Sequence, residues 1–283
     1  MRQRRTKAAM GQLAQQIIDV LSEDHPQSCR HIFYRMTDPR LPEPVEKCDR
    51  RGYVPVQRLT VKMRVSGQIP YGWITDSTRR GYFAETYGGP ERAMRRTAML
   101  YRRSYWDTAE DYVEVWCESR SIAGVIQDTC EHYAVPLYPT GGFPSLSLVY
   151  EAAQHIRHEA AGRPVTILYI GDHDAAGVLI DTDTEAKLRA HLPDTDLTFR
   201  RLAVTREQIH LMRLPTKPPK DRRGGFEGDT VEAEAIPAAT MRELLAEAIE
   251  GFIDPHQMAV LMEAEASERE LLMAMAANME ARR

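Results

Sequence analysis

The chain has 283 residues, of which 43% are hydrophobic and 28% are charged. This composition excludes a disordered chain, and no apolar run reaches the roughly 18 to 20 residues that a membrane-spanning helix needs. The cysteines lack the paired spacing of a zinc site; they are Cys29, Cys48, Cys117 and Cys130. We therefore expect a cytoplasmic globular protein with reduced thiols and no membrane contact.

The net charge of −4 hides an uneven distribution of charge along the chain. Residues 1–105 carry 20 Lys and Arg against 10 Asp and Glu, whereas residues 106–283 carry 17 against 31. A basic first third favours contact with a polyanion such as nucleic acid. Attraction between the two parts of the chain is the alternative explanation.

The basic part begins with three segments of helical character. Apolar positions at helical spacing predict helices over 6–23, 27–36 and 54–67, and residues 67–83 are typical of short extended pieces with a turn. This order is the outline of a winged helix-turn-helix, and a plain three-helix cap is the alternative. The third helix and the wing carry the candidate DNA-binding residues Arg58, Lys62, Arg64, Arg79 and Arg80.

The rest of the chain alternates between strand and helix patterns after a connector at 87–110. Strands are predicted at 113–118, 135–142, 165–172 and 197–205, with helices at 121–134, 146–160, 176–192 and 205–212. Such alternation predicts an α/β fold with a mostly parallel, Rossmann-like sheet flanked by helices. A Pro- and Gly-rich loop and two helices, near 237–251 and 255–281, complete the second unit, residues 106–283.

Acidic residues stand at the ends of two predicted strands. Glu118 ends the first, and Asp172 and Asp174 follow the third, in the stretch IGDHDAAG. Ligands of open α/β sheets bind beyond the carboxyl ends of the strands, and residues two apart in an extended strand share a face. Oxygen ligands of this kind suit Mg²⁺ or Mn²⁺. Turn formation and helix capping by Asp are the alternative explanation.

Two motifs now resemble a known family. Glu118 in WCESRSIAGVI and the Asp172-His-Asp174 sequence in ILYIGDHDAAG are similar to the Toprim pattern. The segment TGGFPSLSLVYEAA between them resembles the Gly-Pro-Ser segment of the topoisomerase VI A-subunit family, which includes the meiotic double-strand-break transesterase. The resemblance implies that Glu118, Asp172 and Asp174 bind Mg²⁺ or Mn²⁺ and that no other cofactor is bound.

The same family places a catalytic tyrosine in a winged-helix domain ahead of Toprim. Its local pattern of an Arg followed by an aromatic pair is similar to Arg30, Phe33 and Tyr34 in CRHIFYRM. The resemblance thus implies that Tyr34 attacks a DNA phosphodiester, that Arg30 helps it ionise, and that Glu118 transfers a proton at the leaving oxygen. It also implies a homodimer in which the tyrosine of one protomer works with the acids of the other, so that both strands of double-stranded DNA are cleaved. It further implies a nucleoid location and a separate GHKL ATPase subunit for any ATP-driven strand passage.

Two other functions stay open on the sequence. One is a Toprim nuclease that hydrolyses DNA with metal-activated water, and the other is a non-catalytic DNA-binding protein. A further acidic pair, Glu232 and Glu234 in VEAEAIP, is interpreted as mainly structural.

Overall fold

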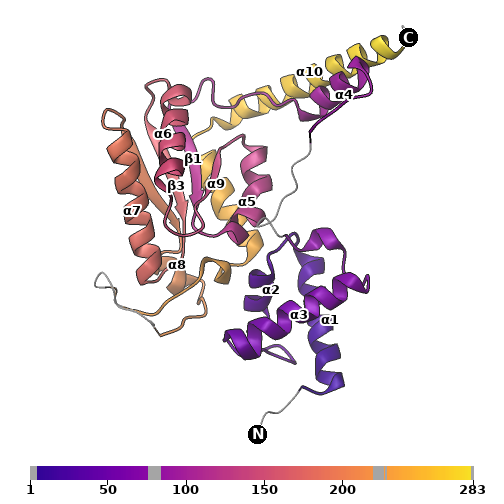
Figure 1. Cartoon of the computed structure of the whole chain (residues 1–283), viewed down its shortest axis with the longest axis vertical. Coiled ribbons are helices and arrows are strands. Elements are labelled where there is room, and N and C mark those ends of the chain that lie inside the picture. The colour runs from indigo at the N-terminus through magenta and orange to yellow at the C-terminus, as the bar shows by residue number, and fades with distance from the viewer. Residues whose placement is uncertain (1–4, 76–83, 219–225, 227, 282–283) are drawn as a thin grey trace.

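The computed structural model describes residues 5–75, 84–218, 226 and 228–281, and Figure 1 shows three parts along its long axis. We call residues 5–75 the N-terminal unit, the parallel sheet with its covering helices the sheet unit, and the two paired helices at the far end the arm. The two predicted DNA-binding residues of the wing, Arg79 and Arg80, lie outside the described residues.

The N-terminal unit contains the three predicted helices, α1 (Lys7–Glu23), α2 (Cys29–Arg35) and α3 (Val54–Val65). The side chains of Thr6 and Ser28 cap the first two, because each accepts a hydrogen bond from an otherwise unpaired backbone N–H. The three helices pack around a fully buried core formed by Leu13, Ile17, Ile32, Phe33, Val56 and Met63.

The segment around α3 contains short turns. A π-helical turn, Asp49–Tyr53, leads into α3, and a 3-10 turn, Tyr71–Trp73, follows it. Residues Gln27 and Ile74 form an isolated parallel bridge. Within the described part of this unit there is thus a three-helix core with one bridge, and the two-stranded wing is not seen.

The sheet unit confirms the predicted α/β fold. Its sheet is parallel, with β1 (Tyr112–Cys117), β2 (Leu137–Pro139), β3 (Val165–Ile170) and β4 (Leu197–Ala203) in the order β2-β1-β3-β4. β1 and β3 are neighbours, and their last residues, Cys117 and Ile170, are in register. The residues that follow the two strands therefore meet at one edge, which we call the carboxyl edge.

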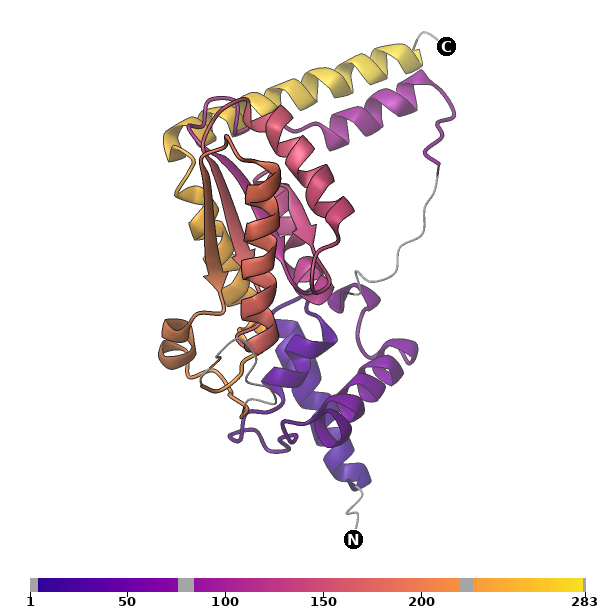
Figure 2. The ribbon, with the colours of Figure 1, turned by 60° about the vertical axis from the view of Figure 1, so that its left-hand side comes forward.

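Helices cover both faces of this sheet (Figures 1 and 2). Side chains alternate along the strands, so Val115 and Leu168 pack with α5 (Arg120–His132) and α9 (Ala238–Glu250) in one core. Trp116 and Ile167 pack on the other face with α6 (Leu146–Ala160) and α7 (Ala175–His191). A short helix α8 (Arg206–Leu211) and a 3-10 turn, η4 (Ala233–Ala235), lie beyond the carboxyl edge.

The arm consists of α4 (Pro90–Leu100) and the long C-terminal helix α10 (Pro255–Ala281), which project from the sheet unit (Figure 2). The prediction that residues 87–110 are only a connector was wrong, because they contain the helix α4. The segment after α4 is tied to α10, because Tyr101 donates to Glu268 at 2.8 Å and Arg102 to Glu265 at 3.0 Å. This partner lies far away in the sequence, which explains why the local pattern missed α4.

The 27 residues of α10 make it the longest described helix. Neither this helix nor any other in the described part of the chain is both long and apolar enough to cross a membrane.

Candidate functional site

The carboxyl edge brings together two of the predicted acids, Glu118 and Asp172. Glu118 follows β1, and its Oε2 accepts a hydrogen bond of 3.1 Å from the backbone N–H of Asp172, which follows β3. The carboxylate of Asp172 accepts a hydrogen bond of 2.8 Å at Oδ1 from the backbone N–H of Ala233 in η4. These contacts place both carboxylates between the sheet and η4.

Asp174, the third predicted acid, has a structural task. Its Oδ1 accepts a hydrogen bond of 2.7 Å from the N–H of Gly177 and so caps α7. Gly177 is required here, because a Cβ would lie 2.2 Å from the backbone oxygen of Asp172. The helix therefore starts directly behind the acids, and the capping explanation from the sequence holds for Asp174.

Glu234 is a site residue that the sequence interpretation missed. It lies in η4 and is 6% exposed, and its Oε1 accepts hydrogen bonds from Ser119 at 3.0 Å and from Ser121. Ser119 follows Glu118 directly and caps α5, and Ser121 lies in the first turn of that helix. The only signal in the sequence was the acidic pair in VEAEAIP, which carries no information on the strand it meets.

The acids at this edge are short of positive charge. Burial raises the pKa of Asp172 well above its usual range, and the charges of Glu234 and Glu118 raise it further. Burial also raises the pKa of Glu118, to which the charge of Asp174 adds. The carboxyl edge therefore favours the binding of a proton or a cation.

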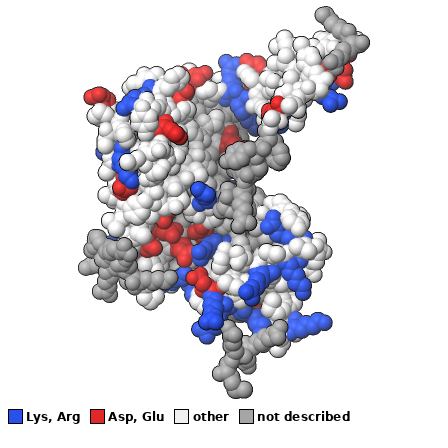
Figure 3. All heavy atoms as spheres, viewed as in Figure 1, with Lys and Arg blue, Asp and Glu red and all other residues white. Residues whose placement is uncertain are grey.

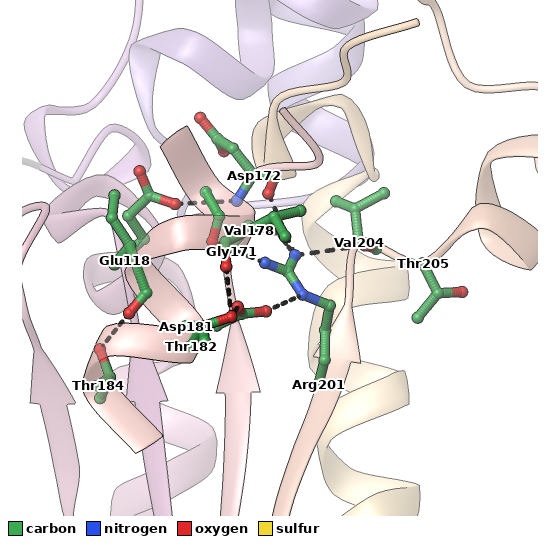
Figure 4. A network of polar contacts seen from close by, with 12 residues as sticks. Glu118, Gly171, Asp172, Val178, Asp181, Thr182, Thr184, Arg201, Val204 and Thr205 are labelled. Carbon is green, nitrogen blue, oxygen red and sulfur yellow. Dashed lines mark hydrogen bonds and ion pairs between the residues drawn. The ribbon is translucent and has the colours of Figure 1, made fainter. Parts of the chain in front are cut away.

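Arg201 fixes the backbone around the acids, as Figure 4 shows. Its guanidinium donates to the carbonyl oxygens of Gly171 at 3.0 Å, Asp172 at 3.1 Å and Gly177 at 3.0 Å, and to Asp181 Oδ2 at 2.7 Å. One side chain from β4 thus holds the end of β3 against the start of α7. Its hydrogen bonds at the acids go to carbonyl groups, so it positions the carboxylates without neutralising them directly.

The donor chemistry of this edge is the one that Mg²⁺ and Mn²⁺ prefer. No three Asp, Glu, His or Cys side chains in the described ranges are arranged to chelate an ion directly. Mg²⁺, however, usually keeps several waters and contacts one or two carboxylates. The hydroxyl of Tyr169 is buried next to Glu118 and has no hydrogen-bond partner within the described residues, which also leaves a donor and an acceptor for a hydrated ion. Glu118 and Asp172 are therefore the two carboxylates that suit contact with a hydrated ion, and Glu234 adds negative charge beside them.

The predicted tyrosine lies against the same edge. Tyr34 on α2 is 6% exposed, and its hydroxyl makes no hydrogen bond of good geometry within the described residues. Burial raises the pKa of Tyr34, and the nearby charge of Glu232 raises it further. Arg30 opposes this effect, but it is paired with Glu232 at 3.1 Å. In this arrangement Tyr34 is held in its neutral form.

The contact between the N-terminal unit and the sheet unit, which we call the seam, combines a shared apolar core with polar contacts. Lys47 donates to the carbonyl oxygen of Pro215, and Asp24 pairs with Arg242 and accepts from the N–H of Ala239 at 3.0 Å. Figure 3 shows Asp and Glu gathered at this seam, with Lys and Arg over the N-terminal unit.

The candidate DNA-binding residues of α3 differ in their exposure and in their contacts with other residues. Arg58 and Lys62 are exposed one helical turn apart, and neither forms an ion pair within the described part of the chain. Arg64 is half-buried; it lies 4.8 Å from the ring centre of Tyr71 and donates to its carbonyl oxygen at 3.1 Å. Two of the three are thus available to a polyanion.

Within the described residues, the side chain of His173 makes no hydrogen bond to the acids of the carboxyl edge. Its backbone N–H and carbonyl form a bridge with Val231, its ring lies edge-on to Phe226 at 5.3 Å, and burial with the charge of Arg201 lowers its pKa.

Comparison of the chain with protein-family models, with curated proteins and with solved structures finds no match.

Proposed function

We propose that the protein is a DNA-cleaving transesterase that uses Tyr34 and a divalent cation, as the resemblance to Toprim and to the topoisomerase VI A subunit implies. One observation carries the proposal. Tyr34, from the basic N-terminal unit, and the acids Glu118, Asp172 and Glu234, from two strand ends and η4, lie at one seam. A nucleophile and a cluster of acids are the two parts that this chemistry needs.

In the proposed reaction the oxygen of Tyr34 attacks a DNA phosphorus atom. A bond forms between the tyrosine oxygen and phosphorus, the bond from phosphorus to the 3′ oxygen breaks, and the tyrosine proton passes to water. The 3′ oxygen takes up a proton from water, and Glu118 at the end of β1 passes that proton on. The bond energy is kept in the phosphotyrosyl link, so the strand can be joined again.

A Mg²⁺ or Mn²⁺ ion held by Glu118 and Asp172, with Glu234 beside them, would stabilise the negative charge that develops on the phosphate and the leaving oxygen. Arg201 keeps the two strand-end acids in place through the backbone. Arg58 and Lys62 would contact the DNA backbone outside the seam. One tyrosine cuts one strand, so the proposal includes a homodimer for cleavage of both strands. In contrast to the arrangement that the resemblance implies, this proposal pairs Tyr34 with the acids of its own chain.

The test is to incubate supercoiled DNA with the protein and Mg²⁺ or Mn²⁺ and to stop the reaction with detergent. We expect a covalent protein–DNA complex that is lost in Tyr34→Phe and in Asp172→Ala. Tyr71→Phe is the matched control, because Tyr71 is a 62% exposed tyrosine of the same unit. Binding without cleavage under either metal would contradict both catalytic proposals and leave a non-catalytic DNA-binding protein.

A metal-dependent nuclease is the second candidate, and the burial of Tyr34 favours it. A tyrosine that is 6% exposed, with a raised pKa, is not ready to attack. Cleavage that survives Tyr34→Phe but not Asp172→Ala would establish hydrolysis by water and overturn the transesterase.

A further inference from the structure

Glu232 is bound by cations from two different parts of the chain. Arg30 on α2 contacts its Oε2 at 3.1 Å, and Lys217, from the loop before η4, contacts its Oε1 at 2.9 Å. Each carboxylate oxygen thus takes its own charged donor. Proteins bind the two non-bridging oxygens of a phosphodiester in the same way, with a separate cationic side chain on each oxygen.

The side chains around Glu232 make up a larger anion site than one carboxylate fills. Lys47 lies 5.5 Å from the ring centre of Tyr34, and Lys217 lies 5.9 Å from it. Burial and the charge of Lys217 lower the pKa of Lys47 to about 8, which shows that cations crowd this place. Lys47 and Lys217 therefore flank the tyrosine ring, Arg30 lies one helical turn before Tyr34 on α2, and the carboxylate of Glu232 is bound between Arg30 and Lys217.

The hydroxyl of Tyr34 gives a second sign that an anion site lies here. It is buried and close to Glu232, which raises the pKa of Tyr34, but no hydrogen bond of good geometry satisfies it among the described residues. Buried hydroxyls are almost always hydrogen-bonded, and an exception needs an explanation. A group placed between Tyr34 and the three cations would supply the partner.

We propose that Glu232 occupies the binding site of a DNA phosphodiester, so that Arg30, Lys47 and Lys217 form a phosphate site beside Tyr34 that the chain's own carboxylate closes. The identification of Tyr34 as the attacking group rests on the proposed function. The anion site itself rests on the contacts of Glu232. DNA then activates the protein by displacing Glu232, which frees the three cations for the phosphate.

The contacts of Glu232 itself suit such an exchange. Apolar residues of the N-terminal unit and the sheet unit share one buried core, which holds the two units together. Glu232 adds ion pairs with Arg30 and Lys217 to this core. Such pairs contribute little net free energy when another anion can replace them, so a phosphodiester that takes the place of Glu232 meets a low energetic cost at this point.

The direct test is the binding of inorganic phosphate to Glu232→Gln, measured by calorimetric titration without divalent cations. Glutamine keeps the shape of the side chain but removes the charge that competes with phosphate. We expect phosphate to bind at least about tenfold more tightly than to the unchanged protein, since hydrogen bonds to charged groups contribute about 1.5 to 3 kcal/mol. Glu243→Gln, an exposed position on α9, makes the same change in net charge and is expected to have no effect.

A second variant shows where the phosphate binds. Adding Arg30→Gln and Lys217→Gln to Glu232→Gln is expected to remove the gain, whereas the same gain in the triple variant would overturn the site. Equal phosphate affinity of the unchanged protein and Glu232→Gln would also overturn it. Circular dichroism checks that each variant is folded. If a variant that contains Glu232→Gln does not fold, the same variant is made with Glu232→Ala instead.

Covalent complex formation, measured in parallel, separates this inference from the proposed function. Tighter phosphate binding by Glu232→Gln with no covalent complex in any variant would support the phosphate site and contradict the transesterase. A covalent complex that forms equally fast in both proteins, with no gain in phosphate affinity, would support the transesterase and contradict the role of Glu232.

Discussion

β1 contains one acid and is followed directly by another, and the two have opposite surroundings. Glu114 lies inside the sheet with no exposed surface, and its two oxygens accept hydrogen bonds from Tyr112 at 3.0 Å and Trp116 at 2.8 Å. Glu118, half-buried just after the strand, lies near two other acids, Asp172 and Glu234. The first is satisfied by its own strand, whereas the second forms no ion pair within the described residues. The comparison teaches that partners, more than burial alone, separate a structural acid from a candidate ligand.

The largest effect is expected at the end of the strand. Asp172→Asn should reduce DNA cleavage by at least about 100-fold, because it removes a ligand of the proposed ion. The same change should raise the free energy of unfolding in EDTA, since it relieves the repulsion from Glu118 and Glu234. Cleavage gels and urea unfolding measure the two effects.

Asp194→Asn, at an exposed position before β4, is the matched control and should change neither quantity. A loss of stability in Asp172→Asn without any loss of cleavage would make Asp172 a structural acid like Glu114, and the comparison would fail.

A smaller effect is expected inside the sheet, where burial raises the pKa of Glu114 to about 7. The folded state then binds a proton that the unfolded state releases near pH 4.5, so stability is full at low pH and falls as the pH rises to about 7. Glu114→Gln, which resembles the protonated acid, should remove this fall. The gain above pH 7 is roughly 3 kcal/mol, from the size of the pKa shift.

Urea unfolding between pH 4.5 and pH 8 tests this prediction. Two parallel stability profiles, one from the unchanged protein and one from Glu114→Gln, would show that Glu114 does not titrate in this range.

The smallest effects on stability are expected when one of two buried tyrosine hydroxyls is removed. Tyr112→Phe removes a hydrogen bond to Glu114 and should cost about 1 kcal/mol of stability. Tyr169→Phe removes a hydroxyl that has no partner within the described residues, so it should leave the stability within about 0.5 kcal/mol of the unchanged protein. Equal losses, measured by thermal unfolding, would mean that the Tyr169 hydroxyl is satisfied and marks no site.

Much of the local structure could be predicted from the sequence. The helix predicted at 255–281 agrees with α10, and the strands that end in Cys117 and Ile170 follow from their apolar runs. The adjacency of the acids that follow them was expected only if the two strands are neighbours, and the sheet order β2-β1-β3-β4 meets this condition. The helix α4 was missed because its stability comes from α10, which no local pattern contains.

By itself, the sequence determined the alternation of strands and helices, the acids at two strand ends and the basic character of the first 105 residues, because these depend on residues close together in the chain. Only the tertiary structure decided which acids face each other. It brought Glu234 to Asp172, turned Asp174 into a helix cap, and buried Tyr34 against Glu232. The reason is that charge pairing and burial depend on distances in space between segments far apart in the chain.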